Sequence, residues 1–465
     1  MKVSSHFELN NPLFYKKTAH IMTLTVLQQL ITVGINFFDN IMVGGLGEAA
    51  ISAASFGNQF YSFFQFVCMG LGSGAIVMSS QFWGRKETDA MRTVTAIAMR
   101  VTLSLCAVFT LFSVLSPQLV LQFFTNDPDI ITAGRTYVLL IGLTIIPAGL
   151  SSTATYLMRS TDNVRIPLIG SLIAFFLNIF FNWVFIFGKL GAPCLGLTGA
   201  AIGTMIARLF EFVFVFGYFV LFEENFSFRL RHFLLSGRDL RSQYIRYSVP
   251  VLISDTLLGL SLALTTVILG HLGKVISASS AMVGSIVQVL SVLNAGMAGA
   301  SAVVVGNTIG TGDIARAKRE GNSFIVLSFL LGLLTVPLLL ALQNPYFRLY
   351  DVAGETKALA RQMILANCVM QPIQTIAFVI SKGILRGGGD TRFLLLADSA
   401  CVWFISLPLG ALGGFVWHIP AIWIYVLLRI EYPLKGLVCL VRYCSGEWIR
   451  EIKAENPGCS DTSLR

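Results

Sequence analysis

The sequence contains one internal repeat. Residues 43–47 read Val-Gly-Gly-Leu-Gly, and residues 269–273, 226 positions later, read Leu-Gly-His-Leu-Gly. The other matches are Gly70 with Gly296, Gly84 with Gly310, Glu87 with Asp313 and Arg92 with Lys318 at a spacing of 226, and Arg159 with Arg386 and Arg165 with Arg392 at 227. The two halves of the chain are therefore predicted to be repeats of each other. In an apolar chain this is typical of secondary transporters, whose substrate site lies between the repeats.

The composition indicates a membrane protein. Of the 465 residues, 55% are hydrophobic and 12% are charged, whereas soluble domains carry about 25% charged residues. A spanning helix needs about 20 apolar residues. Twelve segments qualify: 18–44, 52–80, 93–116, 134–158, 166–188, 198–222, 247–270, 277–306, 322–343, 358–385, 393–413 and 418–441. We expect an all-α membrane protein with two parallel six-helix repeats, in lobes 1–228 and 229–465.

Basic residues form short clusters between the apolar segments, and the net charge is +9. This is typical of cytoplasmic loops rather than of a nucleic-acid partner. The loops assigned to the cytoplasm contain Arg85, Lys86, Arg92, Arg159, Arg165, the linker 223–246, Arg316, Lys318, Arg319, Arg386 and Arg392. The opposite loops contain residues 126–129, Asp351 and Glu355. We expect a multi-pass protein of the cell membrane with both termini in the cytoplasm.

Two carboxylates lie within predicted spanning helices, Asp39 in the first and Asp255 in the seventh. Such a group costs roughly 2.5–3.5 kcal/mol on insertion scales, so each is a candidate functional residue. The alternative is a carboxylate that neighbouring helices hydrogen-bond, or one that lies near water at the end of a helix. Asn178 and Asn182, four residues apart, share a helix face and could either line a cavity or bond to another helix.

Polar residues recur along one face of the second predicted helix, and the repeat spacing places a similar set on the eighth. The two sets are Ser55, Gln59, Ser62 and Gln65, and Ala281, Ser285, Gln288 and Ser291. We expect these stripes to border a water-filled space between the halves, although hydrogen bonding between helices would give the same pattern. Arg208 with Glu211, and Glu431 with Lys435, are spaced for intrahelical ion pairs.

The sequence shows no catalytic or metal-binding motif. It has no His-Glu-x-x-His pattern, and Gly-Thr-Gly-Asp at 310–313 lacks the lysine of a phosphate-binding loop. The eight cysteines form no Cys-x-x-Cys pair and are expected to pack as small apolar side chains. We therefore expect no metal, no cofactor other than a transported ion, and no enzymatic activity.

Several segments resemble the multidrug and toxic compound extrusion family of cation-coupled antiporters, over about residues 15–450. The motifs are Phe-Asp-Asn-Ile-Met-Val-Gly-Gly-Leu-Gly at 38–47, Gln-Phe-Trp-Gly-Arg-Lys at 81–86, Ile-Phe-Gly-Lys-Leu-Gly at 186–191, Gly-Leu-Thr-Gly-Ala-Ala at 196–201 and Leu-Arg-Gly-Gly-Gly-Asp-Thr at 385–391. The resemblance implies two six-helix lobes that form a V around a central cavity with alternating access.

The resemblance also implies roles for individual residues. Asp39 matches the aspartate of the first helix that is implicated in cation coupling, and Asn178 and Asn182 match a polar pair on the fifth helix. One branch of the family has an aspartate where this chain has Asn182. Asp255 resembles an acidic position on the seventh helix of some bacterial members. The sodium-binding carboxylate of the tenth helix has no equivalent, since Gln371, Gln374 and Thr375 occupy that region.

We therefore expect an antiporter that exports organic cationic or amphipathic compounds in exchange for protons or sodium. Asp39, Asn178, Asn182 and Asp255 would couple the cation. The substrate cavity would be lined by Phe37, Phe38, Gln59, Tyr61, Ser62, Gln65, Ser285, Gln288 and Ser291. The expected partners are small organic substrates and the lipid bilayer, and the expected state is a monomer. The alternatives are a flippase for a lipid-linked substrate, which predicts a more cationic cavity, and an intramembrane enzyme.

The charge bias of the loops predicts which positions can be labelled from outside the cell. In cells with single-cysteine variants, a membrane-impermeant maleimide should modify a cysteine at Asp351 but not one at Arg238. The reverse labelling pattern would contradict this topology.

Overall fold

The computed structural model describes residues 7–8, 11–235, 237–348 and 352–452. The predicted outer-loop residue Asp351 lies outside them. Within these ranges the chain is helical, without β-strands. Ten helices there are long and apolar enough to span a membrane, and one pair of shorter helices joined at a bend adds an eleventh candidate. The predicted all-α membrane fold is confirmed.

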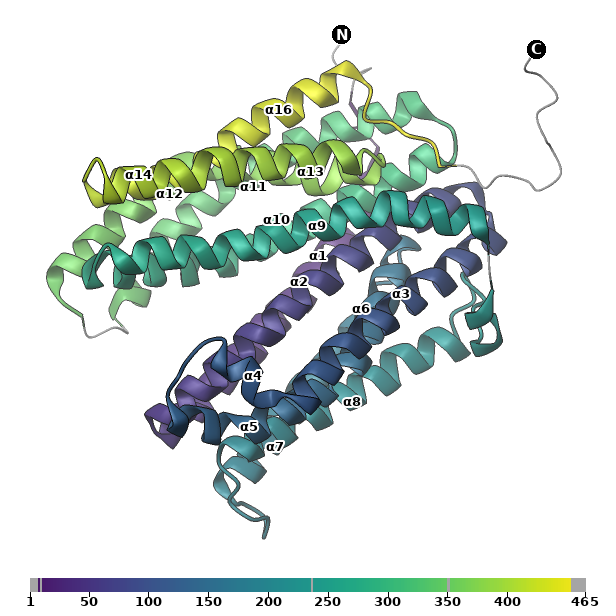
Figure 1. Ribbon diagram of the computed structural model, residues 1–465. Helices are drawn as coiled ribbons and strands as arrows, with labels where there is room; N and C mark the ends of the chain where they lie inside the picture. Colours follow the sequence, from purple (N-terminus) through teal and green to yellow (C-terminus); the bar gives the residue numbers. More distant parts are fainter. Residues whose placement is uncertain (1–6, 9–10, 236, 349–351, 453–465) are drawn as a thin grey trace.

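The first half supplies helices α1 to α8, in the purple-to-teal part of Figure 1. Their bounds are α1 Pro12–Val43, α2 Glu48–Arg85, α3 Thr88–Leu115, α4 Pro117–Gln122, α5 Pro128–Leu143, α6 Ile145–Ser160, α7 Arg165–Phe187 and α8 Leu197–Leu221, with the short 3-10 turn η2 Gly44–Leu46 before α2. The segment 134–158 was expected to be one straight helix, but α5 and α6 meet at a 42° bend. Pro147 lies in the first turn of α6, where its missing N–H leaves no helical hydrogen bond unmade.

The second half follows a linker that contains the 3-10 turn η3 Leu230–Leu234. Its bounds are α9 Arg238–His271, α10 Lys274–Gly310, α11 Ile314–Arg348, α12 Gly354–Phe378, the π-helical η4 Val379–Leu385, α13 Thr391–Ser399, the π-helical η5 Ala400–Ser406, α14 Leu407–Phe415, α15 Ala421–Leu427 and α16 Glu431–Ser445. The last expected span, 418–441, is broken between α15 and α16. Here too a proline, Pro433, lies in the first turn after the break.

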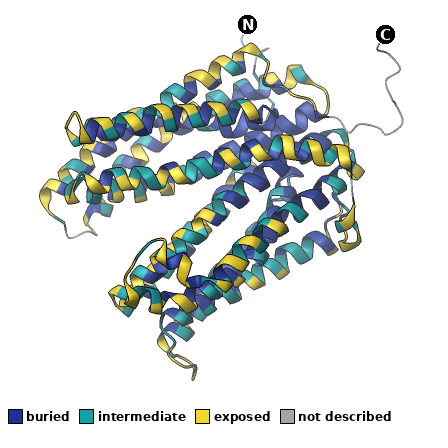
Figure 2. Cartoon of the chain, viewed as in Figure 1, coloured by how far each residue is buried: buried dark blue, intermediate teal, exposed yellow. Residues whose placement is uncertain are grey.

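The helices form two groups that meet at one end and diverge at the other (Figure 1). Between the groups, α1 packs on α10, and α2 packs on α9 and α10. Residues 70–82 of α2 and 300–310 of α10 are all buried, whereas the earlier turns of both helices have many exposed side chains (Figure 2). The resemblance predicts this V. We call the end where the groups meet, near the start of α1 and the end of α16, the closed end, and the other the open end.

Repeated glycines allow the close approach at the closed end. A Cβ atom at Gly84 would lie 2.1 Å from the carbonyl oxygen of Asn307, and one at Gly310 would lie 2.1 Å from that of Gln81. Gln81 and Asn307 are themselves 226 positions apart. The contact between α2 and α10 is therefore reciprocal, as expected for two copies related by a rotation.

The other repeated glycine pair makes a second reciprocal contact. A Cβ at Gly70 would lie 2.6 Å from the Cα of Leu252 on α9, and one at Gly296 would lie 2.4 Å from a methyl carbon of Val26 on α1. Val26 and Leu252 are also separated by 226 positions. Small residues at helix crossings let backbones come close in a membrane, where packing must replace the hydrophobic effect.

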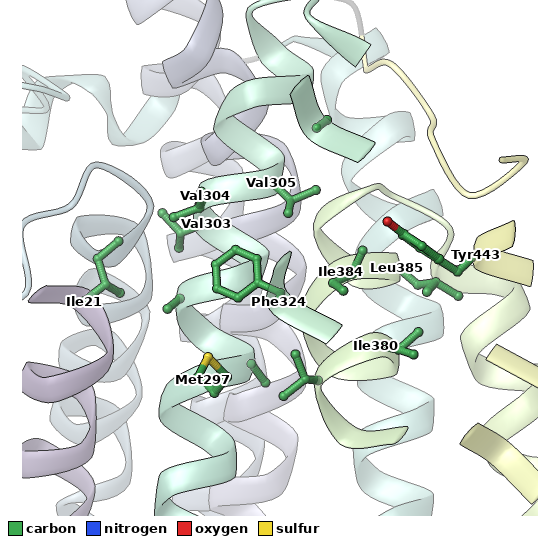
Figure 3. Close-up of a cluster of buried hydrophobic side chains, with 14 of the residues drawn as sticks. Ile21, Met297, Val303, Val304, Val305, Phe324, Ile380, Ile384, Leu385 and Tyr443 are labelled. Carbon is green, nitrogen blue, oxygen red and sulfur yellow. The ribbon is translucent and has the colours of Figure 1, made fainter. Parts of the chain in front are cut away.

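A hydrophobic core spans the closed end (Figure 3). Phe14 and Ile21 of α1 pack there with buried residues of α10, α11, η4 and α16. Because both halves contribute side chains to this cluster, its burial stabilises the closed arrangement. Separation of the halves at this end would expose apolar side chains that now contact one another.

The segment after α16 crosses from one half to the other at the closed end. The backbone N–H of Arg450 donates to the carbonyl of Gly388 (2.8 Å), and Trp448 is fully buried. The Gln81 side chain of α2 then accepts from the backbone N–H of Ile452 (2.9 Å) and donates to the carbonyl of Arg450 (3.1 Å). This segment therefore ties the C-terminal half to α2.

Replacement of Gly84 by alanine should destabilise the closed end, because the added methyl group has no space. Overpacking of this kind costs about 1–3 kcal/mol. We expect the thermal unfolding midpoint of the purified protein to fall for Gly84→Ala and for Gly310→Ala. Gly284→Ala is the matched control on α10, since nothing lies within 4 Å of its added Cβ. Equal midpoints for all three variants would show that the glycine contacts do not set the stability of this end.

Candidate functional site

Asp39 lies near the end of α1 and faces two asparagines of α7. The Nδ2 group of Asn182 donates to Asp39 Oδ1 at 2.5 Å and lies 3.5 Å from Asn178 Oδ1. Asn178 in turn donates to the hydroxyl of Thr204 on α8 at 3.2 Å. Both asparagines are buried, whereas Asp39 is partly exposed. The structure thus brings together the three residues that the sequence suggested for the N-terminal half.

No cationic side chain in the described ranges lies within the 4.0 Å ion-pair distance of Asp39. Arg208 acts on the charge of Asp39 from beyond that distance. That guanidinium forms its own ion pair with Glu211 at 2.9 Å, as the spacing predicted, and lies over the ring of Tyr61. Asp39 therefore depends on amide hydrogen bonds rather than on an ion pair.

A chain of hydrogen bonds continues from Glu211 through the N-terminal half. Ser171 donates to Glu211 (2.8 Å), Gln28 donates to Ser171 (3.4 Å), and Arg159 donates to Gln28 (3.2 Å). Arg159 was predicted to lie in a loop. It is instead buried in the last turn of α6 and stacks over a tyrosine ring. A basic residue at a helix end can turn inward when acceptors lie within the bundle.

The predicted cavity residues lie toward the open end. Gln59, Ser62, Ser285 and Gln288 are exposed, and Ser291 is partly buried. Gln65 donates to the Tyr61 hydroxyl at 2.9 Å. The rings of Phe37 and Phe38 are 61% and 38% exposed and contact each other. The exposed positions on α2 and α10 begin where the halves diverge, which is consistent with both stripes bordering the space between the lobes. That they line a substrate path stays a prediction.

Asp255 has different surroundings from Asp39. It is fully buried on α9 and pairs with Lys382 of η4, with 2.8 Å between Nζ and Oδ1. Arg386 reaches the same carboxylate with two nitrogens, at 2.8 Å and 3.1 Å. Arg386 was assigned to a loop, but it follows η4 and is buried. The negative charge of Asp255 is thus balanced by two cationic side chains.

A second carboxylate, Asp398 of α13, completes this charge cluster. Lys382 Nζ lies 2.7 Å from Asp398 Oδ2, which also accepts from the hydroxyl of Ser254 at 2.7 Å. Lys435 of α16 lies 3.3 Å from Asp398 Oδ1. The sequence had suggested Glu431 as the ion-pair partner of Lys435, and it missed Lys382 and Asp398 altogether. The observable signal was a single charge within each of two apolar runs, 376–385 and 393–413.

The two buried networks occupy equivalent positions in the repeats. By the repeat spacing, Gln28 corresponds to Ser254, Arg159 to Arg386, and Ser171 to Asp398. The Asp39 site has no such counterpart, since its three residues correspond to Thr265, Ile405 and Leu409. The halves therefore share a polar layer, but the positions of the C-terminal half that correspond to the Asp39 site contain no carboxylate.

Neither network resembles a metal centre. Across the ranges that the structure describes, no three His, Cys, Asp or Glu side chains are grouped so that they could hold a metal ion. Amide and hydroxyl groups surround Asp39, and cationic nitrogens surround Asp255 and Asp398. These groups equip Asp39 to exchange a proton or a monovalent cation, and they equip the other two carboxylates to form fixed ion pairs.

Comparison with known proteins identifies the family of this chain. The family model described as MatE matches residues 25–184 and 250–412, one stretch in each half. The "Probable multidrug resistance protein NorM" of Neisseria meningitidis serogroup B is 23% identical over 457 residues, which cover 95% of this chain and 98% of that protein. The multidrug resistance protein NorM of Vibrio vulnificus is 22% identical, over 86% of this chain and 88% of that protein.

Solved structures show the same fold. A variant of the Vibrio cholerae MATE transporter VcmN superposes with a TM-score of 0.85 at 16% identity, over 94% of this chain and 98% of that one. A MOP superfamily transporter from Pyrococcus furiosus superposes with a TM-score of 0.84 at 14% identity, over 93% and 95% of the two chains. The resemblance seen in the sequence motifs is thereby confirmed. The chain belongs to the MatE family, and it is a transporter embedded in the cell membrane rather than an enzyme.

Proposed function

We propose that this transporter exports organic cationic or amphipathic compounds across the cytoplasmic membrane in exchange for an inward-moving cation. Relatives that match most of the chain are named multidrug resistance proteins. The V shape supports alternating access, in which the closed end opens as the open end closes. With the termini in the cytoplasm, as the loop charges predict, the open end faces outward.

The observation that carries the proposal is the uncompensated charge of Asp39. Asp255 and Asp398 have cationic partners within 3.3 Å, whereas Asp39 has only amide donors. A carboxylate in a membrane protein that lacks a fixed counterion can gain one from solution. A proton and a positively charged substrate would then compete for the same negative charge. Because the proton and the substrate compete for Asp39, binding of one favours release of the other, and this can couple their movements across the membrane.

A proton is our first choice for the coupling ion. Asp39 is the one carboxylate of its site, and its described neighbours there are two amides and a hydroxyl. Protonation needs only one carboxylate oxygen, whereas a hard metal cation prefers several oxygen ligands. The membrane potential supplies about 2.3 kcal/mol per charge per 100 mV to drive the inward movement. Sodium is the alternative ion.

Replacement of Asp39 by asparagine should abolish coupled export without unfolding the protein. The amide keeps the shape of the side chain but cannot ionise. We expect dye efflux from proteoliposomes, driven by a proton gradient without sodium, to fall to the level of empty liposomes. Asp129→Asn is the matched control, because Asp129 is exposed in the first turn of α5, and its efflux should equal that of the wild type.

Two results would count against these assignments. Normal efflux by Asp39→Asn would remove this residue from the coupling mechanism. Efflux by the wild type that appears only after sodium is added would replace the proton by sodium, with Asp39 still tested by the same variant.

A further inference from the structure

The charge cluster of Asp255, Lys382, Arg386, Asp398 and Lys435 has no part in the proposed exchange at Asp39. We propose that it contains a binding site for a small monovalent cation, of the size of ammonium or potassium, and that the Lys382 ammonium group permanently occupies this site. The cation of the C-terminal lobe would then be a side chain of the protein itself, and this lobe would bind no free cation from solution.

The geometry around Lys382 Nζ is that of a bound cation. Three oxygens surround it: Asp398 Oδ2 at 2.7 Å, Asp255 Oδ1 at 2.8 Å and Ser254 Oγ at 3.2 Å. An ammonium group has three N–H donors, so each can be directed at one oxygen. The two carboxylate distances are those of charge-assisted hydrogen bonds to a compact cation, and the longer contact is to a neutral hydroxyl. A free ammonium or potassium ion of similar radius would fit the same position.

The site is enclosed on all sides. Asp255 is fully buried, and Lys382 and Asp398 are only 8% and 7% exposed. The oxygens come from α9 and α13, and the lysine enters from the π-helical η4. Segments of π-helix widen the helical turn and are frequent at functional sites. The enclosure leaves no route for a second cation while the ammonium group is present.

The other cationic residues of the cluster allow Lys382 to be replaced without leaving either carboxylate unpaired. When the ammonium group is removed, Asp255 retains Arg386, and Asp398 retains Lys435. Each carboxylate therefore keeps one cationic partner, and the cluster is not left with an unpaired charge. The other charged or titratable groups that act on the cluster are Tyr156 of α6, Cys401 of η5, and Glu431, Tyr432 and Cys439 of α16. The Lys382→Ala substitution removes the central ammonium group and the alkyl chain of the lysine.

The test is the response of purified full-length Lys382→Ala to small cations. We expect methylammonium chloride, and to a lesser degree potassium chloride, to raise its thermal unfolding midpoint by about 5 °C above that in N-methylglucamine chloride at the same ionic strength. N-methylglucamine is too large for the vacated space and controls for salt effects. The wild type should show no difference between the three salts.

Two further variants make the result specific. The double variant Lys382→Ala with Asp398→Asn should show no cation-dependent rise of the unfolding midpoint, because the site loses the negative charge of Asp398. Lys382→Met keeps most of the stem and so should respond less than Lys382→Ala. Equilibrium binding of rubidium-86, a potassium analogue, should be saturable in Lys382→Ala and undetectable in the wild type.

Saturable rubidium binding by the wild type that Asp398→Asn abolishes would overturn the proposal, because the site would then be open to solution. So would a Lys382→Ala protein that folds but responds equally to all three salts. If Lys382→Ala folds in none of the salts while the double variant folds, the vacancy cannot be refilled, and the proposal is wrong. All of these measurements leave Asp39 unchanged and involve no transport, so their failure is distinct from a failure of the proposed exchange.

Discussion

A charge inside a lipid bilayer needs a partner, and this requirement organises the interior of both lobes. In the C-terminal lobe two aspartates are held by Lys382 of η4, by Arg386 directly after η4, and by Lys435 of α16. In the N-terminal lobe Glu211 is held by Arg208, while Asp39 has only amide donors. Removal of one partner from a buried ion pair commonly costs about 3–5 kcal/mol. Asp39 has no ion-pair partner among the described residues, and this is the basis for the cation exchange that we propose there.

The lobes themselves are held together by contacts that can be broken and remade. At the closed end, repeated glycines bring α2 against α10 and the segment after α16 hydrogen-bonds to Gln81 of α2. Such contacts are many and individually weak, so an alternative packing of the same surfaces can have a similar free energy. The internal duplication gives each lobe an equivalent surface toward its partner, and in the proposed transport cycle a rocking motion would exchange which end is closed.

Much of this could be predicted from the sequence. The repeat spacing identified Gly70, Gly84 and their partners before their reciprocal contacts were known, and the cost of a buried carboxylate identified Asp39. The sequence singled out Asp255 and Lys435, but it could not show that they group with Lys382 and Asp398, because tertiary packing alone brings these segments together. Arg386 was assigned to a loop because the sequence alone does not show whether a basic residue at a helix end points outward. The breaks before Pro147 and Pro433 were missed because apolar composition alone does not show where a helix is interrupted.

The two proposals assign different electrostatic roles to the lobes, with an exchangeable charge in one and a fixed cation in the other. Proton release on substrate binding tests this difference most directly. In a weakly buffered solution of purified protein, addition of a cationic dye should release protons from the wild type, because dye and proton compete for Asp39. The Asp39→Asn variant should bind dye without release. Equal release from both proteins would contradict the assignment of the exchangeable charge to Asp39.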